Sequence, residues 1–122
     1  MDKIFLNHTN HPFEKWGALQ KKAAAVYGMV IDMPFPQIPP SMGEADVREL
    51  AAHNAEEIVN MNPVAVLCQG EFCYTFALTE ILKKHCICVV CACSERSSQE
   101  HLLADGSVQK SVEFRFVRFR AY

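Results

Sequence analysis

The stretch VAVLCQGE, residues 64–71, places a polar turn directly behind an unbroken apolar run. Such a run is typical of a strand that is buried on both faces of a sheet. Gly70 permits a tight turn, and apolar side chains follow it densely, which predicts a well-buried helix over residues 71–84. The stretch is therefore a strand–turn–helix unit, from which α/β domains are built.

Two further apolar runs end in polar clusters. Residues 3–8 predict a first strand that leads into the cluster of residues 7–11, and residues 86–94 predict a fourth strand that leads into residues 94–96. The carboxyl ends of parallel strands meet at one edge of a sheet, where open α/β sheets hold their ligands. We therefore expect these two clusters and residues 69–71 to meet at a ligand site.

The segments between these runs predict further elements. Apolar side chains recur at helical spacing over residues 13–27, behind a first-turn Pro12. Residues 29–31 predict a short second strand that ends in Asp32. Four prolines exclude a helix or a central strand from residues 33–40, which we expect to form a stiff, extended loop.

Capping and turn signals mark the remaining elements. Ser41 and Glu44 match a capping box for a helix that Asn62-Pro63 ends. Asp105-Gly106 lies between β-prone arms and predicts a hairpin, and the alternation of the second arm slips at Phe116-Val117, as a bulge would produce. The second strand of the hairpin carries a basic stripe, which we expect to protect an exposed sheet edge from pairing or to line a cleft shared in a dimer. Its members are Arg115, Arg118 and Arg120.

The predicted order is strand, helix, strand, helix, strand, helix, strand and hairpin. Such alternation is typical of a parallel sheet with right-handed crossovers. We therefore expect residues 1–122 to form a single α/β domain, Rossmann-like and three-layered, with a mostly parallel sheet and an antiparallel C-terminal hairpin.

Composition narrows the classes of partner. Half of the 122 residues are hydrophobic and the net charge is −2, so no positive field indicates duplex DNA or a membrane surface as partner. The longest apolar stretch is about ten residues, too short to span a bilayer. The polar N-terminus does not read as a signal peptide, so we expect a cytoplasmic protein with reduced thiols.

Four of the six cysteines form the pattern C-x-C-x-x-C-x-C at Cys86, Cys88, Cys91 and Cys93. Zinc sites use C-x2-C pairs on turns, whereas these cysteines lie in a continuous apolar run. Free cysteine packs as a small hydrophobic residue, so we expect these thiols in the core. Metal or thiol chemistry is the alternative, but no cofactor and no metal site is expected.

The cluster of Gln69, Gly70 and Glu71 is a generic anion seat. Gly70 permits close backbone approach, and a helix N-terminus presents free N–H groups with a positive dipole end. Glu71 could act as a base or bind a ribose hydroxyl, or it could cap its own helix. The cluster matches neither a dinucleotide motif nor a P-loop.

The other two clusters offer donors for phosphate and groups for proton transfer. Arg96 suits bidentate phosphate recognition, although a surface ion pair with Glu95 is the alternative. A histidine of the first cluster can act as a general acid or base, while its Asn and Thr side chains can donate to phosphate or read a base edge. Alternatively Thr9 or Asn10 caps the next helix and the histidines are solvated.

With these residues in place, the chain resembles the small stand-alone CRISPR-associated Rossmann-fold (CARF-like) proteins of type III systems, above all their ring nucleases. The resemblance covers most of the chain and rests on the loop Asn-His-Thr-Asn-His-Pro, on Gln-Gly-Glu, on Cys-Ser-Glu-Arg and on the ending Phe-Arg-Phe-Val-Arg-Phe-Arg. Many CARF domains carry Gly-Thr or Gly-Gly where this chain has Gly70-Glu71, which weakens the case for phosphate at that point.

The resemblance implies a homodimer that binds a cyclic oligoadenylate, commonly the four-nucleotide ring, and cleaves it to switch off type III CRISPR signalling. Cleavage needs no metal, because a ribose 2′-hydroxyl attacks the neighbouring phosphate. The alternative is a sensor or sponge that binds without cleaving. The catalytic residues that the resemblance implies are His8, Glu71 and Arg96. The ligand-binding residues that it implies are Asn7, Thr9, Asn10, His11, Gln69, Gly70, Ser94 and Glu95.

Overall fold

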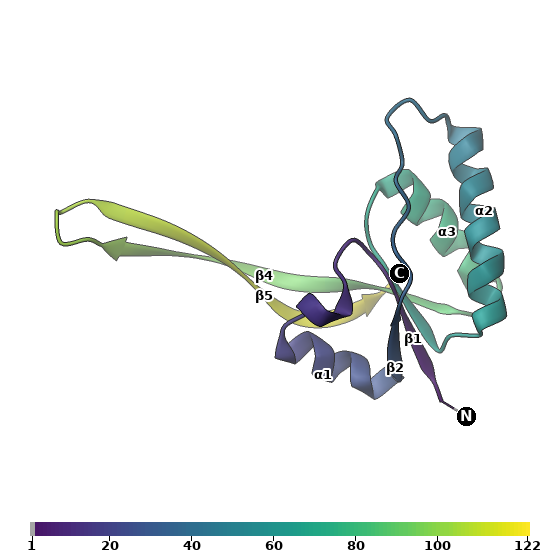
Figure 1. Cartoon of the computed structure of the whole chain (residues 1–122), viewed down its shortest axis with the longest axis horizontal. Coiled ribbons are helices and arrows are strands. Elements are labelled where there is room, and N and C mark those ends of the chain that lie inside the picture. The colour runs from purple at the N-terminus through teal and green to yellow at the C-terminus, as the bar shows by residue number, and fades with distance from the viewer. Residues whose placement is uncertain (1) are drawn as a thin grey trace.

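The computed structural model describes residues 2–122 as an α/β fold with one five-stranded sheet (Figure 1). The strand order is β2-β1-β3-β4-β5, with every neighbouring pair parallel except β4 and β5. The expected α/β class, with a mostly parallel sheet and an antiparallel C-terminal hairpin, is confirmed. The strands are β1 (Ile4–His8), β2 (Met29–Asp32), β3 (Ala65–Cys68), β4 (Cys88–Leu102) and β5 (Val108–Ala121).

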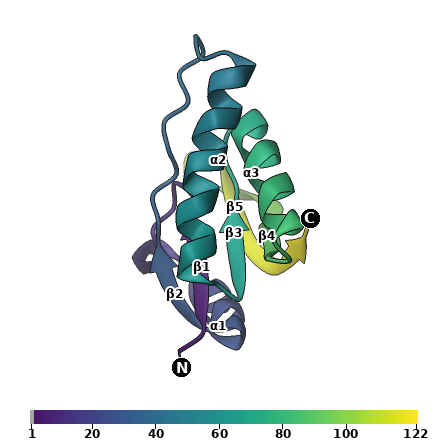
Figure 2. The same cartoon turned by 90° about the vertical axis from the view of Figure 1, so that its right-hand side faces the viewer.

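Helices lie on both sides of the sheet, and Figure 2 shows α2 and α3 side by side over one of them. Side chains alternate along a strand, so Phe5 packs toward α1 whereas Leu6 packs toward α2 and α3. Two apolar clusters therefore form, one on each side of the strands. The helices are the short 3-10 turn η1 (Phe13–Lys15), α1 (Ala18–Tyr27), α2 (Glu44–Met61) and α3 (Phe72–Lys84).

Two helix starts differ from the prediction. The expected helix over residues 13–27 is interrupted, because Trp16 takes an extended conformation to bury its ring and Gly17 becomes the N-cap of α1. The expected capping box is also wrong, since Gly43 is the N-cap of α2 and no side chain caps it. Propensity marked the region of each start, but tertiary packing fixed the residue.

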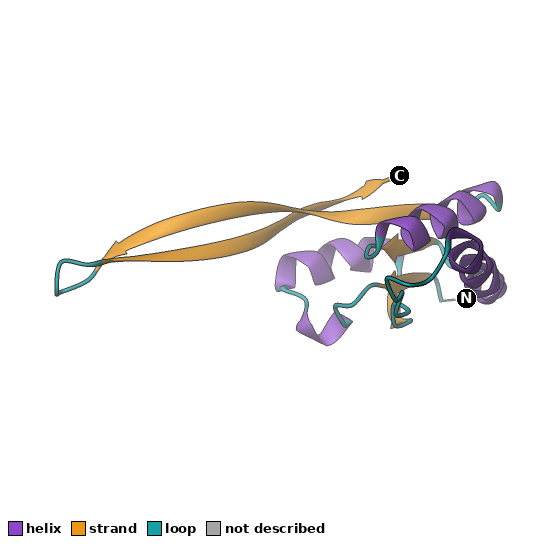
Figure 3. Ribbon diagram, turned by 90° about the horizontal axis from the view of Figure 1, so that it is seen from above, coloured by secondary structure: helices purple, strands orange, loops and turns teal. Residues whose placement is uncertain are grey.

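The predicted hairpin is confirmed, but its first strand is longer than expected. β4 runs unbroken from the sheet into the hairpin, because β5 pairs with it from Val90↔Ala121 to Leu102↔Val108. Gly106 takes a φ of 86° in the turn, and the register shifts beside Cys93, where the predicted bulge leaves Val117 unpaired. Figures 1 and 3 show the ribbon reaching far beyond the helices. We call its exposed part, residues 94–115, the arm.

The four-cysteine run does not lie in the core, contrary to the prediction. Cys86 and Cys88 are exposed, and Cys91 and Cys93 are partly exposed. The run begins in the turn after α3, where Cys86 has a φ of 60°, so the buried positions of β4 fall on valines instead. Within residues 2–122, no three His, Cys, Asp or Glu side chains lie close enough together to hold a metal ion.

The helix α3, which was expected to be well buried, is buried on one face only. Tyr74, Leu78 and Leu82 are fully buried, but Phe72 and Phe76 are 89% and 66% exposed. These two phenylalanines lie one helical turn apart and form an apolar strip on the outside of the molecule. None of the helices described here is both long and apolar enough to cross a membrane.

Candidate functional site

A polar cavity of about 390 Å³ opens at the carboxyl ends of β1 and β3. These strands are neighbours, but the chain leaves β1 toward β2 and leaves β3 toward β4, so the connections diverge between them. Such a switch point is the usual ligand site of an open α/β sheet. Members of all three predicted clusters line it. They are Thr9, Asn10, His11, Gln69, Gly70 and Ser94.

The cavity wall contains a firmly held His11. Its carbonyl oxygen accepts hydrogen bonds from Asn7 Nδ2 and from Trp16 Nε1, both 2.9 Å long. Its backbone N–H donates to Thr9 Oγ1 over 3.1 Å. Because these hydrogen bonds fix its backbone, His11 lines the cavity from a rigid support.

The buried Asn7 and Thr9 build that support. Asn7 Nδ2 also donates to Asp32 Oδ1 at the end of β2, over 2.8 Å, and Asn7 Oδ1 accepts from Thr9 Oγ1 over 2.9 Å. Asp32 in turn accepts from the backbone N–H of Phe13. The polar groups of Asn7 are therefore satisfied within the protein, so this residue positions the loop and does not face the cavity.

Gln69 extends the sheet with its side chain. Its Oε1 accepts from the backbone N–H of Ala92 over 2.9 Å, and its Nε2 donates to the carbonyl of Ala92 over 3.3 Å. After Cys68 the backbone of β3 no longer pairs with β4, and the Gln69 carboxamide makes the two hydrogen bonds to β4 instead. The side chain thus fixes one wall of the cavity as well as lining it.

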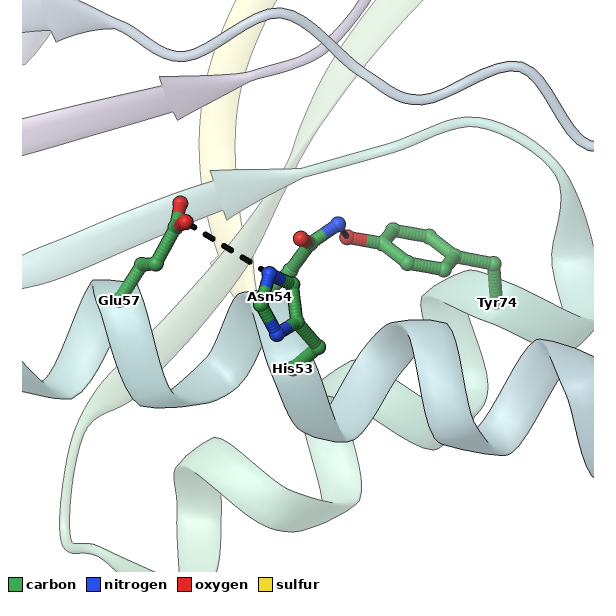
Figure 4. Close-up of polar contacts among 4 residues, drawn as sticks. All are labelled: His53, Asn54, Glu57 and Tyr74. Carbon is green, nitrogen blue, oxygen red and sulfur yellow. Dashed lines mark hydrogen bonds and ion pairs between the residues drawn. The ribbon is translucent and has the colours of Figure 1, made fainter.

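The predicted catalytic His8 is not brought to the cavity. It is fully buried, its Nδ1–H donates to the carbonyl of Met33 over 2.8 Å, and its Nε2 accepts from the Tyr74 hydroxyl over 2.7 Å. Asn54 completes this network by donating to the Tyr74 oxygen, as Figure 4 shows. Desolvation by burial lowers the pKa of His8, although the hydrogen bond to Met33 partly opposes the shift. A neutral imidazole with both nitrogens engaged joins β1, α2 and α3.

Gly70 is required by a neighbouring side chain. A Cβ at this position would lie 2.5 Å from Cζ of Phe35, whose ring covers the glycine. Phe35 belongs to the predicted proline-rich loop, and it also packs against the rings of His8 and Tyr74. We expected a ligand to approach the backbone closely at Gly70. On this side, Phe35 of the loop occupies that place instead.

Glu71 caps its own helix. Its carboxylate accepts from the backbone N–H groups of Cys73, over 2.6 Å, and Tyr74, over 3.1 Å. Partial desolvation would raise the pKa of Glu71, but these hydrogen bonds outweigh it and hold the pKa below its ordinary value. The expected anion seat at the start of α3 is therefore filled by a carboxylate of the chain itself.

The remaining predicted residues lie at the base of the arm. Arg96 follows Ser94 on the same face of β4, so it stands beyond the rim of the cavity. Glu95 points to the opposite face, where its strand partner is Arg115. Neighbouring residues of a strand face apart, so the alternative ion pair between Glu95 and Arg96 does not form.

One cavity residue was missed in the sequence. Gln20 lines the cavity from the first turn of α1, opposite Gln69 and Ser94. Since the sequence placed the helix start at Pro12, it gave no reason to single out this glutamine. Trp16, taken from its type as a core residue, does pack in the core but also forms part of the cavity wall.

A family model, described as the uncharacterized protein MJ1673 family, matches residues 3–120. The chain belongs to this family. No curated protein matches the chain, and no solved structure does. The match covers all the residues that line the cavity and every strand and helix except Ala121, the last residue of β5, so the site lies wholly within the matched part of the chain.

Proposed function

We propose that this member of the MJ1673 family is a Rossmann-like, three-layered, CARF-like domain that binds a cyclic oligoadenylate and cleaves it. The observation that carries the proposal is the convergence of three separate polar clusters on one cavity at the switch point of the sheet. The layering is supported by helices on both sides of a sheet whose order reverses between β1 and β3. In this proposal the protein works in the cytoplasm, on a cyclic tetra-adenylate, and ends type III CRISPR signalling.

The reaction needs a base and a stabiliser of negative charge. The 2′-hydroxyl gives up its proton, the 2′-oxygen forms a bond to the adjacent phosphorus, and the bond from phosphorus to the 5′-oxygen breaks. The 5′-oxygen leaves with the electron pair and becomes a hydroxyl by taking a proton from water, and a 2′,3′-cyclic phosphate remains. Among the residues that line the cavity, we assign the general base to His11, the one histidine there, since the lining contains no carboxylate. Arg96, just beyond the rim, stabilises charge on the phosphoryl oxygens. Asn10 and Ser94 hold the ring in place.

These roles differ from those implied by the resemblance at two residues. His8 is sealed in the core, so its general-base role passes to His11. Glu71 already accepts two amide hydrogen bonds as a helix cap, and its lowered pKa makes it a weak base. The third implied residue, Arg96, keeps the role of phosphate ligand.

The size of the cavity favours a shared site. A volume of about 390 Å³ lies near the lower end for pockets that enclose a drug-sized ligand, and a ring of four nucleotides is larger. A ligand with two-fold symmetry fits a two-fold dimer in which each copy supplies half of the site. The proposal therefore includes a homodimer.

The test is incubation with labelled cyclic tetra-adenylate in the presence of a chelator. Linear products that end in a cyclic phosphate are expected from the unaltered protein and are lost in His11→Ala and Arg96→Ala. Arg115→Ala is the matched control, because Arg115 is also an exposed arginine but lies on the opposite face of the arm. Protein that retains the ring intact would make it a sensor or sponge. Neither binding nor cleavage, with the six-nucleotide ring tested alongside, would overturn the proposal.

A further inference from the structure

The apolar side chains of the arm are not covered by any other part of the described structure. Every residue from Ser94 to Arg115 is exposed, so beyond its base the ribbon packs against nothing else in residues 2–122. An isolated two-stranded ribbon is marginally stable in water. A ribbon of this length therefore needs a surface to cover one of its faces.

The two faces of the arm differ sharply. The register puts Phe114 opposite Arg96, Val112 opposite Ser98 and Val108 opposite Leu102, all on one face. Phe116, whose ring packs on the buried Phe119, starts this row at the base of the arm. The other face carries only polar pairs. They are Glu95 with Arg115, Ser97 with Glu113, Gln99 with Ser111 and His101 with Gln109.

The row from Phe116 to Val108 thus continues the α1-side core outward, beyond the point where α1 can cover it. Phe114 is 70% exposed, and Val108 and Val112 are about half exposed. The arm cannot bend back onto its own body, because paired strands hold it extended and it points away from α3 (Figure 3). Its occupant must come from outside the chain.

The body carries a matching surface. Phe72 and Phe76 project from α3 beside a hollow of about 850 Å³, which α2 and the proline-rich loop close on the other side through Val47 and Ile38. Three glutamates and one arginine also line this hollow. They are Glu44, Glu71, Glu80 and Arg48. On the apolar face of the arm, Lys110 is paired with Glu100, so the outer part of the arm brings no net charge to the hollow. Arg96 lies at the base of the arm, where the proposed function assigns it to the phosphate.

We propose that the arm of one copy lies on the Phe72–Phe76 strip of a second copy, with Phe114 and Val112 against these two rings. Because each copy has one arm and one strip, a two-fold dimer closes with two identical contacts. An arm about 30 Å long and about 10 Å wide covers roughly 300 Å². Two arms and the two surfaces beneath them bury roughly 1,200 Å², which reaches the range of stable interfaces.

This inference gives the interface of the homodimer included in the proposed function. Its test measures mass without ligand, so its failure is distinguishable from a failure to bind or cleave the ring. At micromolar concentration the unaltered protein should sediment at twice the chain mass of 13.8 kDa. Phe114→Glu and Phe76→Glu should each give monomers, whereas Ser111→Glu, on the polar face of the same strand, should leave the dimer intact.

Mixing the two monomeric variants provides the sharper result. The arm of the Phe76→Glu protein is intact, and so is the strip of the Phe114→Glu protein, so the mixture should recover a dimer with one good contact. This dimer buries half the area, so it should be weaker than the unaltered dimer and should form only at higher protein concentration. A monomeric unaltered protein would overturn the proposal. So would a dimer that Phe114→Glu breaks and Phe76→Glu does not, because the arms would then pair with each other. The proposal would also be overturned by a monomer that binds another protein or a vesicle through the arm.

A cross-link covers the case in which a glutamate variant fails to fold. Cys73 is exposed and lines the hollow beside Phe72. A bis-maleimide should join a Val112→Cys residue in one copy to Cys73 in the other, and peptide mapping identifies the link. Absence of this link, with links to other cysteines present, would place the arm elsewhere and contradict the proposal. Cys73→Ser should remove the link.

Discussion

The Nε2 atom of His8 and the hydroxyl oxygen of Tyr74 lie 2.7 Å apart in the fully buried core. The strand β1 and the helix α3 are thereby joined by a hydrogen bond between groups that have no access to water. Asn54 of α2 donates to the same hydroxyl, and Met33 accepts from the other imidazole nitrogen. One polar network thus ties the first strand to two helices and to the start of the proline-rich loop.

Tyr74→Phe should destabilise the protein by about 1–3 kcal/mol. The change leaves the buried His8 Nε2 and the partly buried Asn54 Nδ2 without their partner, while the ring and its packing remain. Urea unfolding followed by circular dichroism measures the loss. Tyr27→Phe is the matched control, since the ring of Tyr27 packs on Phe5 at the edge of the core. Equal midpoints for the two variants would show that the network contributes nothing.

The stability of the protein should fall as the pH drops below about 6.5. Burial lowers the pKa of His8 from 6.5, so the unfolded chain binds a proton there before the folded protein does. The contribution is complete above pH 6.5 and is lost on acidification at up to about 1.4 kcal/mol per pH unit. Glu71, whose pKa is also lowered, acts only below its ordinary value of 4.5. His8→Gln should remove the slope between these values, and an unchanged slope would assign it to other groups.

Glu71→Ala should cost about 1 kcal/mol of stability through loss of the helix cap. The carboxylate satisfies two backbone N–H groups that the helix cannot pair. Amide hydrogen exchange at Cys73 and Tyr74 should rise together with the fall in unfolding free energy. Glu80→Ala, which changes an exposed carboxylate later in the same helix, should have little effect on either measurement. Unaltered exchange at both amides would refute the capping role.

Gly70→Ala should destabilise the protein by about 1–3 kcal/mol, because the new methyl group would overlap the ring of Phe35. The penalty should shrink in a Phe35→Leu background, and a double-mutant cycle measures that coupling. Gly17→Ala is the control, since a Cβ there meets no atom within 4 Å. A cost at Gly70 that does not depend on residue 35 would point to backbone conformation instead.

The sequence predicted the order and type of most elements because they depend on local signals. Unbroken apolar runs marked the parallel strands, prolines marked the loop before α2, and Asp105-Gly106 marked the hairpin turn. The switch-point rule then placed six predicted residues around one cavity. These features need only residue type, spacing and strand direction.

Errors arose where the facing direction of a side chain depends on distant elements. Asn10 and His8 are both polar residues of one cluster, yet only Asn10 lines the cavity. His8 turns into the core, where its two ring nitrogens form hydrogen bonds with Met33 and Tyr74. Phe76 is apolar but exposed, since no element of its own chain covers that side of α3. The cysteine run was misjudged because Cys86 lies in a turn and β4 begins later.

The bond between the Gln69 side chain and the Ala92 backbone makes the width of the cavity depend on one carboxamide. A carboxamide offers a donor and an acceptor together, whereas a carboxylate offers acceptors only. Gln69→Glu therefore keeps the shape of the side chain but repels the Ala92 carbonyl. The carboxyl end of β3 would then separate from β4 at Ala92, and faster deuterium uptake at the Ala92 amide would record it. Selection could thus resize the site through one residue without disturbing the core.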